Sequence, residues 1–165
     1  MSLTSVILDS SLIRDARFKQ HYHPHLPIAP KRCFDPESLQ YIASQEPHLL
    51  TAMITVAARD LPQGEDILRV CSAYMHQLVS QLSAGKRCDV EAVEALLLLA
   101  EWEPQDSLSE AREVGCGEED RAAWMHVGLA LRIGYFLGLD RTAIKHEDED
   151  KAAHFNRRRV TWAGE

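Results

Sequence analysis

Three histidines, His21, His23 and His25, alternate along one short segment, a spacing that could bind a metal ion. Alternate side chains of an extended segment point to the same side, so two of these imidazoles could share one ion. Pro24 fixes the backbone between them, and the sequence places no fourth ligand nearby. We therefore expect ordinary loop histidines here rather than a metal site.

An acidic run follows His146, where residues 147–150 are Glu, Asp, Glu and Asp. Carboxylates attract calcium, but an EF-hand loop also needs a glycine at its sixth position and a glutamate at its twelfth, and both are missing. We expect a solvated acidic turn at 146–150.

The four cysteines, Cys33, Cys71, Cys88 and Cys116, include no C-x-x-C pair, which excludes a zinc ribbon, a zinc cluster and a thioredoxin-type centre. Reduced and mostly buried thiols are expected. Cys71 with His76, or Cys88 with a histidine, would make a nucleophile and its base, but nothing orients such a pair. The G-x-S-x-G, H-E-x-x-H, P-loop and dinucleotide patterns are also absent from the sequence. The sequence predicts no enzyme and no catalytic, cofactor-binding or metal-binding residue.

One compact basic run, Arg157-Arg158-Arg159, could contact phosphates. A nucleic-acid or import signal needs about five to eight basic residues, so the run is short for that role. Arginines on a helix downstream of an acidic run usually form surface ion pairs, and we expect that here. The net charge of −7 also argues against a DNA-binding surface spread over the domain. No direct contact with nucleic acid is expected.

Helices joined by proline- and glycine-marked loops must position these residues. The chain has 165 residues, 45% of them hydrophobic, enough for one domain with a core. Helical spacing predicts elements at about 8–20, from Asp35-Pro36, from Pro47 to Pro62, at 65–83, 90–102 and 123–138, and from about 150. We expect an all-α, irregular helical bundle of six or seven helices. The longest apolar run, 95–100, is far below the ~20 residues of a membrane span, and no secretory signal is present, so a soluble intracellular protein is expected.

The segment 90–102, capped by Asp89, is apolar on nearly all sides, which is typical of a central helix. Residues 101–120 then hold eight acidic residues and one basic residue, which predicts a solvated acidic loop centred on 103–119. The helix that follows carries Trp124, Val127, Leu131 and Tyr135 on one stripe, with interior glycines that suggest tight packing and Gly138 as its stop. Core packing is expected for Trp102, Trp124 and Trp162.

Three pieces of the chain, in order, carry a family resemblance. The central piece is Ala123-Trp124, then Gly128-Leu129-Ala130-Leu131-Arg132, then Leu137-Gly138-Leu139. Upstream lie Phe18, Tyr22, His23-Pro24, Leu26 and Pro27; downstream lies Asn156-Arg157-Arg158-Arg159-Val160-Thr161-Trp162. Together these pieces resemble the fungal-specific transcription factor domain, the regulatory middle region of zinc binuclear cluster transcription factors, over residues 17–163.

The resemblance implies a nuclear protein that regulates RNA polymerase II transcription, with zinc-dependent DNA binding and frequent dimerisation at the level of the family. The six-cysteine cluster is absent, and the family region continues past the arginine helix, so residues 1–165 are expected to be an amino-terminal part of the domain. No zinc or other cofactor is expected in this chain. The expected partners are other proteins, a second copy or a small effector, and no membrane. Trp162 and Val160 are expected to lack partners in such a part.

Two alternatives remain beside this interpretation. The first is that the chain is a stand-alone all-α module that binds a protein or a small effector, or else that it is a truncated, non-functional paralogue. The second is a small helical enzyme, which would need a convergent pocket of titratable residues. The sequence leaves the target genes, the effector and the sign of regulation undetermined.

Overall fold

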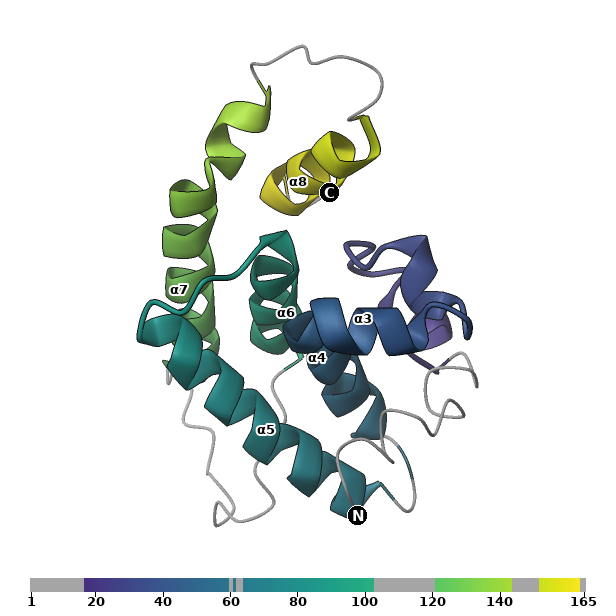
Figure 1. Ribbon diagram of the computed structural model, residues 1–165. Coiled ribbons are helices and arrows are strands. Elements are labelled where there is room, and N and C mark those ends of the chain that lie inside the picture. Colours follow the sequence, from purple (N-terminus) through teal and green to yellow (C-terminus); the bar gives the residue numbers. More distant parts are fainter. Residues whose placement is uncertain (1–16, 60, 62–63, 103–120, 144–151, 164–165) are drawn as a thin grey trace.

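The computed structural model describes residues 17–59, 61, 64–102, 121–143 and 152–163, and every regular element within these ranges is helical (Figure 1). The α-helices are α3 (Leu39–Gln45), α4 (Pro47–Ala58), α5 (Glu65–Ser83), α6 (Val90–Glu101), α7 (Arg121–Leu137) and α8 (Ala152–Ala163). Three shorter turns accompany them: η1 (Phe18–Tyr22), η2 (Lys31–Phe34) and η3 (Leu139–Ala143). The expected all-α helical bundle is confirmed.

Helix α6 is the shared wall of two hydrophobic clusters. One cluster lies around α4 and receives Ala95, Leu98 and Leu99 from α6, together with side chains of the N-terminal turns and α5. The other receives Ala92, Val93 and Leu96 from α6 and joins them to side chains of α7 and η3. In Figure 1, α6 accordingly lies between α4 and α7, with α8 across one end. The prediction of a central helix at 90–102 is correct, because both sides of its apolar surface are buried.

Local signals explain where these helices begin. The Asp89 carboxylate accepts a hydrogen bond of 2.7 Å from the Val90 backbone N–H, which satisfies one free donor at the start of α6. Pro47 occupies the first turn of α4, where a missing N–H costs nothing. The start expected at Asp35-Pro36 is wrong by about one turn, since α3 begins at Leu39.

The physical reason lies in the Asp35 side chain. Its two carboxylate oxygens accept hydrogen bonds from the Glu37 backbone N–H, at 3.1 Å, and from the Ser38 hydroxyl, at 3.0 Å. These bonds stabilise a turn over residues 35–38, and the helix follows that turn instead of including it. The helix expected at 8–20 lies mostly outside the described residues, as do the acidic loop at 103–119 and the acidic turn at 146–150.

Helix α7 ends where the glycine signal predicts. Gly138 adopts a φ of 69°, in the left-handed region, and the chain turns there into η3. Gly134 lies under the Trp162 ring of α8, and a Cβ built on it would come within 3.2 Å of the ring atom Cζ3. Tight packing is therefore correct for Gly134. Gly128 differs, because a Cβ there would meet nothing within 4 Å.

The direction of the apolar stripe on α7 corrects the expectation for Trp124. This side chain is 64% exposed, and Val127, Leu131 and Tyr135 on the same stripe are exposed too. Helix α7 instead contacts the core through its opposite face, with Ala130 and Ile133. Trp102 and Trp162 do pack against the two clusters, so the expectation that Trp162 lacks a partner is wrong, whereas Val160 is 40% exposed. Among the helices that the structure describes, none is long and apolar enough to cross a membrane.

Candidate functional site: a buried ionic cluster

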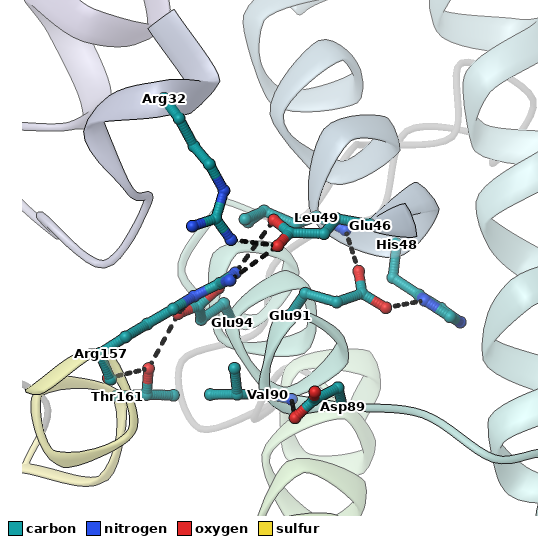
Figure 2. Close-up of polar contacts among 10 residues, drawn as sticks. All are labelled: Arg32, Glu46, His48, Leu49, Asp89, Val90, Glu91, Glu94, Arg157 and Thr161. Atoms are coloured by element: carbon teal, nitrogen blue, oxygen red, sulfur yellow. Dashed lines mark hydrogen bonds and ion pairs between the residues drawn. The ribbon is translucent and has the colours of Figure 1, made fainter. Parts of the chain in front are cut away.

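A buried arginine connects α8 to two other elements (Figure 2). The Arg157 guanidinium donates from Nε to Glu94 Oε1 at 2.8 Å, and from Nη1 and Nη2 to the two oxygens of Glu46 at 2.8 and 3.2 Å. Its Nη2 also forms an ion pair with Glu94 Oε2. The planar guanidinium thus serves two carboxylates at once, a geometry that a lysine ammonium cannot reproduce. We call Arg157, Glu46, Glu94, Arg32 and Thr161 the ionic cluster.

The remaining members complete the pairing of the two acids. Arg32, on the η2 turn, forms an ion pair with Glu46. The Thr161 hydroxyl, one turn after Arg157 on α8, lies 3.0 Å from Glu94 Oε1. The Glu94 side chain is fully buried, and those of Glu46 and Arg157 are only 10% and 11% exposed. Two guanidinium groups, the buried one of Arg157 and the partly exposed one of Arg32, therefore balance two buried carboxylates.

A neighbouring acid on α6 anchors the beginning of α4. Glu91 Oε2 accepts a hydrogen bond of 3.0 Å from the Leu49 backbone N–H, in the first turn of α4. Its other oxygen pairs with His48 Nδ1. A carboxylate at this point satisfies a free donor and interacts favourably with the positive end of the helix dipole. Glu91 and Glu94 are one turn apart on α6, so a single helix face holds both α4 and α8.

The two acids of the cluster have opposite pKa shifts. Burial raises the pKa of Glu94, and the charge of Glu46 adds to this, so the hydrogen bonds from Arg157 and Thr161 only partly offset the shift. Burial alone would also raise the pKa of Glu46, but hydrogen bonds and charge from Arg157 and Arg32 outweigh it and hold that pKa below its ordinary value. The pKa of Arg157 is raised, because the two carboxylates overcome its burial.

Cys33 lies beside this cluster and is fully buried. Burial and the negative charge of Glu46 raise the pKa of its thiol to about 12, so the thiol stays protonated at neutral pH. Burial raises the pKa of Cys71 to about 11. Cys71 is buried on α5 while His76 on the same helix is exposed, so the pair considered as nucleophile and base does not point to one site.

The histidine segment is placed on the N-terminal turns. His21 and His25 are exposed, and the His23 ring stands edge-on to Phe34 at a centroid distance of 4.9 Å. Burial lowers the pKa of His23, with a smaller contribution from Lys19. Among the described residues, no group of three or more His, Cys, Asp and Glu side chains could hold a metal ion.

The expectation of surface pairs for the arginine run is wrong. Arg157 is buried in the ionic cluster, and Arg158 donates to the Leu137 carbonyl oxygen at the end of α7. Only Arg159 of the three is exposed. Sequence analysis missed Glu46 and Glu94, the two acids of the cluster. For Glu94 a signal was available, because an acidic residue inside the most apolar helix is expected to be buried and a buried acid requires a partner.

Chemically, this arrangement holds elements together. Its carboxylates are saturated by cations and hydrogen bonds, so none is free to act as a nucleophile or a base. Arg157 fixes α8 against α6 at Glu94 and against the α3–α4 junction at Glu46, and Arg158 fixes it against the end of α7.

Comparison with known proteins places this chain in a family. Residues 16–164 match the model of the fungal specific transcription factor domain, which is nearly the whole chain. No curated protein and no solved structure matches it. The match includes the α7 stripe, the glycine stop at 138 and the arginine run that holds α8 in place. The chain therefore belongs to the fungal specific transcription factor domain family.

Proposed function

We propose that this chain is the regulatory region of a zinc-cluster-type fungal transcription factor and that it modulates RNA polymerase II transcription in the nucleus. The observation that carries this proposal is the family match over residues 16–164. In this proposal the region is not an enzyme and holds no cofactor, and DNA is bound by a separate zinc cluster. Its own contacts are with proteins or with a small effector.

The use of the arginine run supports the absence of DNA contacts. Phosphate binding requires arginines that reach solvent on one surface. Here Arg157 is paired with two buried acids and Arg158 with a backbone carbonyl, so Arg159 is the one arginine of the run that is exposed to solvent. One exposed arginine in this run, within a chain of net charge −7, is a weak electrostatic attraction for DNA.

The ionic cluster suggests how a signal could change this region. Regulation requires two arrangements whose balance a partner or an effector shifts. Helix α8 is held by a few directional ion pairs as well as by Trp162, so a change at Glu46 or Glu94 would alter its position. We propose α8 as the element that transmits regulation.

A reporter assay tests this function. The chain is inserted between a heterologous DNA-binding domain and an activation segment, and reporter expression in a fungal cell is compared with that of the fusion without it. We expect the chain to change reporter expression, and Arg157→Met to alter that effect while Arg159→Met preserves it. Equal expression with and without the chain would overturn the proposal.

A binding assay tests the DNA part separately. The purified chain is titrated with labelled duplex DNA at low and physiological salt, and fluorescence anisotropy is recorded. We expect no specific complex. Tight binding that weakens steeply with salt would refute the absence of DNA contacts.

A further inference from the structure

Thr161 on α8 follows the short sequence Arg158-Arg159-Val160 and precedes Trp162. Two arginines placed three and two residues before a hydroxyl, with an apolar residue directly after it, form the substrate pattern of basophilic protein kinases. Such kinases bind the two guanidinium groups with acidic side chains, a pairing that suits arginine better than lysine. The sequence that holds α8 in place is therefore also a recognition sequence for phosphoryl transfer to Thr161.

The Thr161 hydroxyl is enclosed while α8 is docked. The residue is 3% exposed, and its Oγ1 lies 3.0 Å from Glu94 Oε1 and 2.9 Å from the Arg157 carbonyl oxygen. A protein kinase takes its substrate as an extended segment, so α8 has to leave its site and unwind before Thr161 can react. Thr161 is therefore a conditional site that is available only when α8 is open.

Few contacts hold α8 against the rest of the fold. Among its described side chains, residues 156–163, only Thr161 is buried, and only Trp162 packs against a hydrophobic cluster. The remaining attachment consists of the ionic cluster and the hydrogen bond from Arg158 to the Leu137 carbonyl oxygen. An element that buries little apolar surface opens locally at a lower free energy than the whole fold unfolds. We therefore expect α8 to detach while the rest of the bundle stays folded.

A phosphate on Thr161 is incompatible with the docked position. There it would lie against the Glu94 carboxylate, so two negative charges would share one buried site. Arg157 and Arg158 precede Thr161 by four and three residues, so on a helix their guanidinium groups can reach the phosphate oxygens. That pairing would remove from Glu46 and Glu94 the cation that balances them. Phosphorylation and docking therefore exclude one another.

We propose that Thr161 is a phosphorylation site for an arginine-directed protein kinase and that its phosphate holds α8 away from the ionic cluster. In the transfer, Thr161 Oγ1 forms a bond to the γ-phosphorus of ATP, and the bond from that phosphorus to the ADP leaving group breaks. The hydroxyl proton passes to the catalytic base of the kinase. The regulatory meaning of this switch rests on the proposed function of α8, whereas the modification and the opening do not.

Phosphorylation of the purified full chain tests the site. The chain is incubated with ATP and the catalytic subunit of cyclic-AMP-dependent protein kinase, and mass spectrometry follows phosphate at Thr161 over time. Gly134→Leu loosens α8 without changing its sequence, because a Cβ at this position already comes within 3.2 Å of the Trp162 ring atom Cζ3. Gly128→Leu is the matched control on the same helix, because a Cβ there meets nothing within 4 Å.

We expect slow labelling of the wild type and of Gly128→Leu at equal rates. Labelling of Gly134→Leu should be about tenfold faster or more, which corresponds to docking weakened by about 1.4 kcal/mol. A cooperative thermal melt shows that Gly134→Leu is folded. If it is not, Glu46→Gln takes its place, because it removes a partner of Arg157 and also leaves the sequence of α8 unchanged.

Hydrogen exchange tests the consequence of the modification. In the phosphorylated wild type, the amides of α8 should exchange about tenfold faster or more than in the unmodified chain, whereas those of α4 should stay protected. Phosphorylated chains in which α8 keeps its protection would overturn the opening. The absence of phosphate at Thr161 in every variant would overturn the site, and equal rates for Gly134→Leu and Gly128→Leu would overturn its dependence on α8. None of these assays involves transcription, so their failure is distinguishable from a failure of the proposed function in the reporter assay.

Discussion

Replacing Arg157 with methionine is the most direct test of the ionic cluster. Methionine keeps much of the apolar stem but removes all four contacts of the guanidinium with Glu46 and Glu94. Glu94, whose side chain is fully buried, is then left with the Thr161 hydroxyl alone among its cluster partners. Glu46 keeps Arg32. We expect a clear loss of stability, dominated by Glu94.

The size of the loss follows from the burial of these groups. Removing one partner of a buried ion pair costs about 3–5 kcal/mol, because the other charge is left uncompensated. The pKa of Glu94 is already raised, so its carboxyl can take up a proton instead of remaining charged. This places the expected loss near the lower end, about 3 kcal/mol, a more than hundredfold fall in the ratio of folded to unfolded chains.

Urea denaturation at neutral pH, followed by circular dichroism, measures this loss. A loss of 3 kcal/mol moves the midpoint by roughly 1–3 M, given the usual dependence of stability on urea. Arg157→Lys should fall between the variant and the wild type, and the exposed Arg159→Met should stay within about 0.5 kcal/mol of the wild type. Amide hydrogen exchange detects the case in which only α8 detaches. A loss below about 1 kcal/mol with unchanged exchange in α8 would refute our account of the cluster.

Four further predictions concern the two acids of the cluster, the cysteines and the cap of α6. Because the pKa of Glu94 is raised in the folded protein, its protonated form stabilises the folded state. This stabilisation is complete below the ordinary pKa of 4.5 and is lost as the pH rises through the raised pKa. The stability of the wild type relative to Glu94→Gln, measured in urea titrations, should therefore fall over that pH range. Glu46, with a lowered pKa, should show the opposite trend when Glu46→Gln is compared at acidic pH, losing its contribution as the pH falls below 4.5. In a Cys116→Ser background, a thiol reagent should label the half-buried Cys88 well before Cys33 and Cys71; equal rates would contradict their burial. Asp89→Ala should lower the free energy of unfolding by about 1 kcal/mol through loss of the α6 cap, whereas Asp89→Asn should retain most of it.

Local signals predicted the helices well. Pro47, Asp89 and Gly138 mark helix ends through contacts or conformations confined to a few residues, and the structure places all three at the ends expected. The helix start predicted at Asp35 was wrong because an aspartate followed by proline can begin a turn as readily as a helix. The choice depends on which donors its carboxylate accepts, and here they are Glu37 N–H and Ser38 Oγ.

The ionic cluster was beyond sequence reasoning of this kind. Arg157 pairs with residues 63 and 111 positions earlier, and no spacing rule connects groups so far apart. The orientation of the α7 stripe was missed for a related reason. Periodicity shows that Trp124 and Leu131 share a face, but not whether another element covers that face.

The distance along the chain between Glu94 and Arg157 has a consequence during protein synthesis. The ribosome makes the 63 residues between them in roughly 3–13 s, at about 5–20 residues per second. Throughout that interval the nascent chain contains Glu46 and Glu94 without the cation that lies between them in the finished protein. Glu46 already has Arg32 at this stage, but burying Glu94 would leave its charge uncompensated, so we expect α6 to pack tightly around Glu94 only after α8 has emerged. Helix α8, which is made after α4 and α6, therefore completes the packing around this acid.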